Sequence, residues 1–194
     1  MAPRAPEAGI DLVDVFSLTH DIEMEIGFGR GMFLMQRAQA VPGLQLLGLE
    51  IKTKLAYQVA QRCERLGLAG VKVLAGDVRA LLPAIRPDRS LARVFLHFPD
   101  PWWKKRHAKR RLAGEDLLAE LARLLRPGGE IFVQTDVEER ATDWLQKLTA
   151  HPAFELADGG LVGGNPYAAV SNRERRAIED GLPVFRVLAH RRSS

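Results

Sequence analysis

The chain has 194 residues, 46% of them apolar, which suits one globular domain with a substantial core. Its net charge is +4, from 28 Lys and Arg against 24 Asp and Glu, and this alone says little about partners. No apolar run reaches the roughly 18 residues of a membrane span, a lone Cys63 excludes a disulfide framework, and five scattered histidines form no metal-ligand pair. We therefore expect a cytoplasmic protein with no metal, in which a short disordered lead-in (residues 1–19) precedes one domain (residues 20–194).

Strand patterns and helix patterns alternate along the chain. Short apolar runs predict the strands, and amphipathic stretches predict the helices between them. Strands are expected over residues 22–26, 44–49, 71–75, 93–98 and 130–135, and helices over residues 31–40, 52–66, a short stretch ending near 85, 115–125 and 138–149. After residue 152, a glycine-rich loop (residues 159–164) and a final strand near residues 184–189 predict a closing antiparallel hairpin.

This alternation predicts an α/β fold with a mostly parallel sheet and helices on both faces, because strand–helix–strand units are right-handed crossovers. In such sheets, ligands bind beyond the carboxyl ends of the strands, so the residues at those ends form the candidate site. An acid lies at or near each of these five ends. These acids are Glu25, Glu50, Asp77, Asp100 and Asp136.

The first strand runs into the sequence EIGFGRG, which contains Glu25, Gly27, Gly29 and Gly31. Glycines let a backbone turn sharply and let a ligand approach closely, although a plain strand-to-helix turn uses them too. The G-x-G-x-G spacing differs from the dinucleotide pattern G-x-G-x-x-G, and Glu25 would repel a pyrophosphate but suit a cationic ligand. S-adenosylmethionine carries a sulfonium and an ammonium and no phosphate, so the turn favours this cofactor over NAD.

Glu50 and Asp77 follow the next two strands. Glu50 stands where a carboxylate accepts hydrogen bonds from both ribose hydroxyls of a nucleoside cofactor, and Asp77 where one accepts from the adenine amino group. Each acid taken singly can equally be a helix N-cap or a first-turn carboxylate. Taken together and in this order, the acids favour a methyltransferase.

The most distinctive stretch is FPDPWWKKRHAKRR, residues 98–111. Two prolines restrict the backbone at Asp100, which suits a carboxylate held in fixed geometry beside a sulfonium. Trp102 and Trp103 offer flat faces for a base or a sugar. Six cations follow: Lys104, Lys105, Arg106, Lys109, Arg110 and Arg111. A charge run is often only a solvated face, but its place after the proline-bracketed acid favours a grip on RNA phosphates.

These motifs, with GLE at residues 48–50, GD at 76–77 and TD at 135–136, resemble the bacterial tRNA (guanine-N7-)-methyltransferase family over residues 21–141. The resemblance implies a Rossmann-like class I methyltransferase with a seven-stranded sheet, S-adenosyl-L-methionine as cofactor, and tRNA as partner. It implies methylation of the variable-loop guanosine (tRNA position 46) by a monomer or homodimer with no partner subunit. The cofactor residues are then Glu25, Gly27, Gly29, Gly31, Glu50, Asp77 and Asp100, and the nucleotide contacts include Lys104 and Asp136.

The chemistry of such a reaction needs little acid–base help. Guanine N7 has an in-plane lone pair and no proton to lose, so alignment matters more than a general base. We expect Asp100 to hold the guanine or the charged end of the cofactor. Asp136 would accept from the guanine N1–H and amino group, and carboxylates near the base would favour the cation that forms.

The match is weaker towards the C-terminus, where family members carry T-x-[FY]-E before the last strand. Here the counterpart is Ser171-Asn172-Arg173-Glu174. Ser171 keeps a hydroxyl and Glu174 a carboxylate, while Arg173 replaces the aromatic residue and can stack on a base or pair with a phosphate. We assign these four residues to the substrate, unless the segment is a variable loop that does not align with the motif.

Two other functions stay open. The same fold and cofactor can serve another RNA guanosine, or a non-catalytic RNA-binding paralogue can keep the pocket for structure alone. The intact acids at the strand ends argue against the paralogue. The glycine spacing argues against an NAD-dependent oxidoreductase, which the fold alone would allow.

Overall fold

The computed structural model describes residues 9–17, 20–99 and 114–193. Its helices are α1 (Leu12–Val15), α2 (Met32–Ala40), α3 (Thr53–Arg65), α4 (Val78–Leu81), the 3-10 turn η1 (Leu82–Ala84), α5 (Gly114–Leu124), α6 (Glu138–Ala150) and α7 (Asn172–Glu179). Its strands are β1 (Ile10–Asp11), β2 (Ile22–Ile26), β3 (Gln45–Glu50), β4 (Val71–Ala75), β5 (Ile85–Arg86), β6 (Leu91–His97), β7 (Leu125–Thr135), β8 (Phe154–Leu161) and β9 (Phe185–Arg191). Among the helices so described, none is both long enough and apolar enough to cross a membrane.

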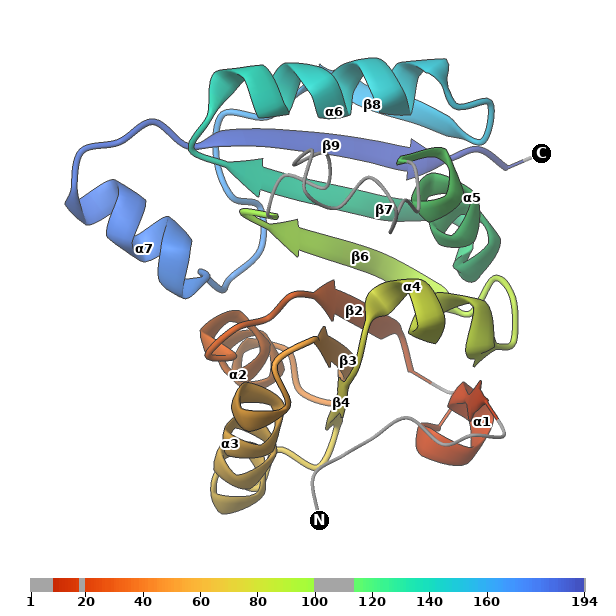
Figure 1. Ribbon diagram of the computed structural model, residues 1–194, viewed down its shortest axis with the longest axis vertical. Helices are drawn as coiled ribbons and strands as arrows, with labels where there is room; N and C mark the ends of the chain where they lie inside the picture. Colours follow the sequence, from red (N-terminus) through yellow and green to blue (C-terminus); the bar gives the residue numbers. More distant parts are fainter. Residues whose placement is uncertain (1–8, 18–19, 100–113, 194) are drawn as a thin grey trace.

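Seven strands form one sheet in the order β4-β3-β2-β6-β7-β9-β8, and β1 pairs separately with β5. Strands β4, β3, β2, β6 and β7 are parallel, whereas β9 is antiparallel to both β7 and β8. The predicted parallel sheet with an antiparallel closure is thus confirmed. The strand order reverses between β2 and β6, which makes the gap beyond their carboxyl ends the switch point. In Figure 1 these ends point to the left, the side on which α2 and α7 lie.

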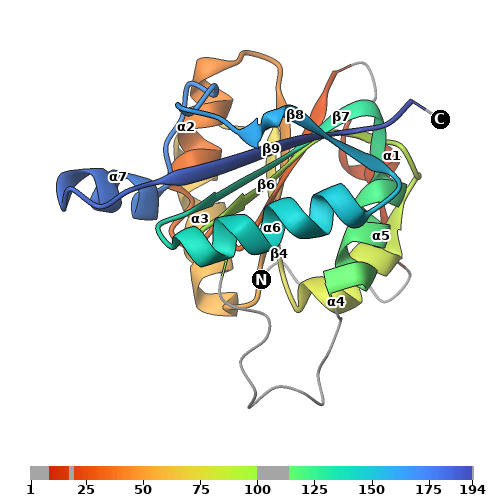
Figure 2. The same ribbon diagram turned by 90° about the horizontal axis from the view of Figure 1, so that it is seen from above.

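Helices cover both faces of the sheet (Figure 2). The aliphatic core on one face lies under α1, α4, α5 and α6, and the core on the other face lies under α2 and α3. Side chains alternate along each strand, so Leu46 belongs to the second core and its neighbour Leu47 to the first. A third, aromatic cluster that includes Phe33, Phe95 and Phe132 covers β6 and β7 on the α2 side.

Four segments differ from their predicted structure. The Pro-Gly-Gly at residues 127–129, which lies between the helix predicted over 115–125 and the strand predicted over 130–135, forms a bulge inside β7, and β7 pairs with β6 on both sides of it. Gly159 and Gly160, expected in a loop, lie inside β8, where the pairing with β9 shifts register. Residues 172–179, for which no helix was predicted, form α7. Residues 10–15, expected within the disordered lead-in, form β1 and α1, with Leu12 fully buried.

Candidate active site at the strand ends

The turn after β2 holds three glycines in the left-handed backbone region. The φ angle is +75° at Gly27, +56° at Gly29 and +70° at Gly31, values that residues with a Cβ rarely adopt. A Cβ at Gly31 would lie 2.6 Å from Cγ1 of Val59 on α3, whereas no described heavy atom lies within 4 Å of a Cβ at Gly27 or Gly29. Packing therefore requires glycine at position 31, while positions 27 and 29 leave backbone on which a ligand can rest.

This difference predicts different costs for alanine at two of these positions. Gly31→Ala combines left-handed strain with overpacking against Val59, so the free energy of unfolding should fall by about 2–4 kcal/mol. Gly29→Ala has the backbone strain alone and should lose about 1–2 kcal/mol. Urea denaturation of both variants measures this, and equal losses would show that the Val59 contact does not decide the identity of residue 31.

Glu50 ends β3 and is held by the glycine turn. Its Oε2 accepts the Gly29 N–H at 3.0 Å, its Oε1 accepts the Lys52 N–H at 2.9 Å, and the residue is buried. Gly48 leaves room for the turn, because a Cβ there would lie 2.6 Å from the Phe28 ring. A carboxylate oxygen can accept more than one hydrogen bond, so Glu50 is oriented and keeps capacity for two further donors.

Glu25 and His97 form a buried pair at the ends of β2 and β6. The Glu25 Oε1 and His97 Nδ1 atoms are 2.8 Å apart, and the side chains are 2% and 3% exposed. Because a carboxylate only accepts, His97 Nδ1 donates and Nε2 becomes an acceptor unless the ring is doubly protonated. Glu25 Oε2 and His97 Nε2 have no hydrogen-bond partner in the described parts of the chain. Buried polar atoms are nearly always satisfied, so these two mark a place for a ligand or solvent donor.

Two residues of this region were not singled out from the sequence. His97 is one, and its position as the last residue of β6, facing the same side as Glu25, is the signal that could have found it. Ile51 is the other: it directly follows Glu50 and is 65% exposed, which is unusual for a large apolar side chain. An exposed apolar side chain next to an acid that could bind a ribose is suited to pack against a flat ring such as a nucleobase.

Asp77 is the N-cap of α4, as the simpler interpretation of this acid predicted. Its side chain accepts the Arg79 N–H at 3.0 Å and the Arg79 Nε–H at 2.8 Å, and a second ion-pair contact joins the same two side chains. The Asp77 side chain is 32% exposed, so it remains within reach of a ligand at the strand ends.

Helix α7 places Arg173 at the ends of β6 and β7. The Arg173 guanidinium forms an ion pair with Asp136 at 2.5 Å and lies 6.0 Å from the ring centroid of Phe98. Phe98, the residue after β6, has a φ of +50°, which is strained for a residue with a side chain. The structure thus brings together Asp136 and Arg173, two residues that we predicted in the substrate site.

Ser171 and Glu174 anchor α7. The Ser171 Oγ accepts the Glu174 N–H at 3.1 Å and so caps the helix. The Glu174 carboxylate, 1% exposed, accepts from Gln134 Nε2 at 2.7 Å, Asn165 Nδ2 at 3.0 Å and Arg186 Nη2 at 3.0 Å. These contacts tie α7 to β7 and β9 and turn the carboxylate away from solvent. Asn172, the first residue of α7, is partly exposed.

A charged network fixes the sheet beside the site. Glu23, fully buried, pairs with Arg37 at 2.8 Å and with Arg93 at 2.9 Å. Arg93 also pairs with Glu130 at 2.6 Å, and the Tyr167 hydroxyl donates to the same carboxylate at 2.8 Å. Burial, and then the Glu130 carboxylate, raise the pKa of the Tyr167 phenol far above its usual range, so Tyr167 keeps its proton and donates.

The remaining predicted site residues lie outside the described residues. They are Asp100, Lys104, Lys105, Arg106, Lys109, Arg110 and Arg111. Phe98 and Pro99, the last described residues before them, follow the carboxyl end of β6, which lies between β2 and β7.

Comparisons with known proteins agree with this geometry. Residues 19–187 match a family model described as "Putative methyltransferase". A tRNA (guanine-N(7)-)-methyltransferase of Synechococcus sp. (strain JA-3-3Ab) is 37% identical over 175 residues, which cover 90% of this chain and 74% of that protein. In fold, this chain is similar to the 16S rRNA methyltransferase KamB, with a TM-score of 0.66 at 16% identity; the match covers 93% of this chain and 92% of the KamB chain. A SAM-dependent methyltransferase from Aquifex aeolicus has a TM-score of 0.61 at 14% identity, and the match covers 92% of this chain and 91% of that one. The predicted fold class and family are therefore confirmed: this chain belongs to the tRNA (guanine-N7-)-methyltransferase family.

Proposed function

We propose that this protein transfers a methyl group from S-adenosylmethionine to guanine N7 in tRNA, at the variable-loop guanosine, position 46. The observation that carries the proposal is the clustering of Glu25, Glu50 and a left-handed glycine turn at adjoining strand ends, in a member of this family. We expect it to act in the cytoplasm as a monomer or homodimer without a partner subunit.

The residues present fit the cofactor. Glu50 has acceptor capacity for the ribose hydroxyls, and the unpartnered Oε2 of Glu25 suits the ammonium group. The backbone at Gly27 and Gly29 allows close approach, and Ile51 offers an apolar surface to adenine, with Asp77 near its amino group. When bound, S-adenosylmethionine supplies an electrophilic methyl group on its sulfonium.

The protein's own contribution to the reaction is alignment and charge. Asp136 accepts from the guanine N1–H and amino group, which fixes the plane of the base. In the structure, Arg173 forms an ion pair with the Asp136 carboxylate. The Arg173 side chain is 55% exposed, so it can turn to a base or a phosphate as RNA binds. We assign Asp100 to the cofactor's charged end, Lys104 to the nucleotide, and the five cations of residues 105–111 to the RNA backbone.

Labelled S-adenosylmethionine and unmodified tRNA transcripts test this function. Digestion of the product to nucleosides should place the label in 7-methylguanosine. Label in another nucleoside would favour a methyltransferase of the same fold with a different RNA acceptor. Binding of both cofactor and tRNA without any transfer would favour the non-catalytic paralogue.

The Glu25–His97 pair gives a sharper test of how the cofactor is held. His97→Phe keeps an aromatic ring in the cluster but leaves Glu25 with no described partner, so its orientation is lost. A hydrogen bond to a charged group contributes about 1.5–3 kcal/mol, so the S-adenosylmethionine Kd should rise about 10- to 100-fold. Calorimetry measures this, and tRNA affinity should stay within about twofold. His97→Asn, which can restore a donor, should lose less. Cofactor binding by His97→Phe within twofold of the unsubstituted protein would show that His97 acts only through packing.

A further inference from the structure

A polar surface outside the candidate active site lies beside the glycine turn, along α3. It is a groove of about 1120 Å³, which we call the α3 groove. Its charged lining residues are Arg30, Lys52, Lys54, Arg62 and Arg65. No Asp or Glu is among its described lining residues. The whole chain carries a net charge of only +4, so five cations around one groove are a strong local concentration.

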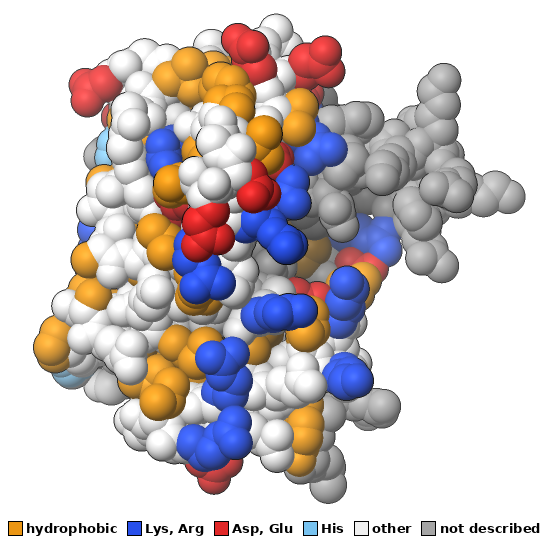
Figure 3. All heavy atoms as spheres, turned by 90° about the vertical axis from the view of Figure 1, so that its left-hand side faces the viewer, with side chains coloured by type: hydrophobic (Ala, Val, Ile, Leu, Met, Phe, Trp, Pro, Cys, Tyr) orange, Lys and Arg blue, Asp and Glu red, His pale blue; other side chains and the backbone are white. Residues whose placement is uncertain are grey.

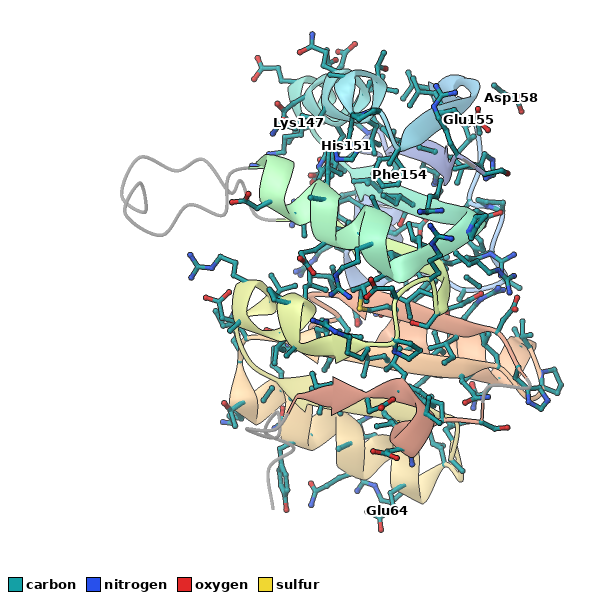
Figure 4. All side chains as sticks on the ribbon, turned by 90° about the vertical axis from the view of Figure 1, so that its right-hand side faces the viewer. Glu64, Lys147, His151, Phe154, Glu155 and Asp158 are labelled. Carbon is teal, nitrogen blue, oxygen red and sulfur yellow. The ribbon has the colours of Figure 1, made fainter. Side chains whose placement is uncertain are left out.

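These cations have no carboxylate partner among the described residues, unlike Arg37 and Arg93 of the charged network beside the site. Arg37, Arg93 and Arg123 each form an ion pair, whereas none of the five groove cations does so with any residue in ranges 9–17, 20–99 and 114–193. The acid on α3, Glu64, is not part of the groove lining, and Figure 4 places it at the end of the molecule farthest from α6. Uncompensated charge of this kind costs stability through repulsion, and an anionic partner removes that cost.

The groove lies next to the edge of the sheet that carries the candidate active site. Arg30 belongs to the glycine turn itself, and the Arg62 guanidinium donates to the Arg30 carbonyl at 3.4 Å. Figure 3 looks onto this edge and shows lysine and arginine side chains in a broken band over the part where α7, α2 and α3 lie. A long anion whose reacting part enters at the strand ends can therefore continue into the groove.

We infer that the α3 groove binds the ribose-phosphate backbone of the tRNA substrate beside the target nucleotide. This inference rests on the proposed function. From Lys54 to Arg65 the helix rises by about 16 Å, at 1.5 Å per residue, which is long enough to meet successive phosphates. Gln58 also lines the groove and can bond to sugar hydroxyls. Contacts of this kind add affinity and orientation but carry no sequence information.

The test compares two double substitutions that remove the same charge. Arg62→Gln with Arg65→Gln alters the groove and keeps good helix formers on an exposed helix face. Arg126→Gln with Arg192→Gln is the control: these side chains are 47% and 49% exposed and lie where β7 begins and β9 ends, at the edge opposite the site. Figure 4 shows Glu155, the ion-pair partner of Arg192, on that side.

Affinity for an unmodified tRNA transcript is measured by fluorescence anisotropy at several salt concentrations, and S-adenosylmethionine affinity by calorimetry. The groove variant should bind tRNA about 10- to 100-fold more weakly near physiological salt. The negative slope of the log association constant against log salt concentration should become shallower by about 1–2. Cofactor affinity should not change, and the control variant should behave as the unsubstituted protein does.

Unchanged tRNA affinity and salt slope in the groove variant would overturn the inference, even if the protein methylates tRNA. Weaker tRNA binding by that variant, in a protein that forms no 7-methylguanosine, would support the groove and reject the proposed function. Polyglutamate is a second probe in the same anisotropy assay. If the groove variant loses polyglutamate binding but keeps tRNA binding, the inference is also overturned, because the groove would then recognise an acidic protein.

Discussion

Replacing Glu50 with alanine should weaken S-adenosylmethionine binding about 100- to 1000-fold. The substitution removes the acceptor for the ribose hydroxyls, and each hydrogen bond to a charged group contributes about 1.5–3 kcal/mol. It also leaves the N–H groups of Gly29 and Lys52 without their acceptor, so the glycine turn loses the contact that orients it. Both effects act on the cofactor, and titration calorimetry measures them directly.

The matched control is Glu64→Ala, which removes a glutamate from the exposed surface of α3 and should leave cofactor affinity unchanged. Glu50→Gln, which keeps one acceptor oxygen, should fall between the two. Binding by Glu50→Ala within threefold of the unsubstituted protein would remove Glu50 from the cofactor site.

Replacing Glu174 with alanine should have the largest effect on stability. The carboxylate is 1% exposed and is bonded to the Arg186 guanidinium, whose side chain is 12% exposed, and to two amides. Removing one partner of a buried pair leaves an uncompensated charge, which costs about 3–5 kcal/mol of unfolding free energy. Because Glu174 anchors α7, the position of Arg173 beside Asp136 should be lost as well, and methylation should fall with it.

Glu179→Ala is the control on the same helix. Its side chain is 63% exposed and 3.7 Å from Arg175, so the loss should be below about 0.5 kcal/mol. Urea denaturation compares the two variants. If Glu174→Ala keeps its stability but loses turnover, Glu174 acts on the substrate, as the family resemblance implies, and the anchoring role is wrong.

The sheet and its strand ends could be predicted because their signals are local. Strands β2 and β4 are short segments with an apolar residue at every second position, each followed by glycine, and their predicted bounds match the structure. Parallel topology then places the residues after those strands at one edge, which brings Glu25 and Glu50 within the same site as the glycine turn.

Helix α7 was missed although a signal for it exists. Ser171-Asn172-Arg173-Glu174 fits the S-x-x-E pattern of a helix N-terminus, and Ser171 does cap α7. The segment is strongly polar, so apolar periodicity could not reveal it. Its helix is held by Glu174, whose partners Gln134 and Arg186 come from β7 and β9.

The buried charges beside the site could not have been predicted from neighbouring residues. Glu23 and Glu25 lie in a five-residue strand, where alternate acids usually indicate a solvated face. The structure buries both because Arg93 and His97 reach them from β6, 70 and 72 residues away. Only the pairing of β2 with β6 brings these partners together.

The most direct test of the account uses two tRNA transcripts that differ at one atom. In the second transcript the variable-loop guanosine is replaced by 7-deazaguanosine, which has a carbon where guanine has N7 and therefore no lone pair to methylate. Methyl transfer from labelled S-adenosylmethionine is measured for both under the same conditions. Transfer to the guanosine transcript and none to the 7-deaza transcript is the predicted result. Equal transfer to both would contradict guanine N7 of the variable loop as the methylated atom.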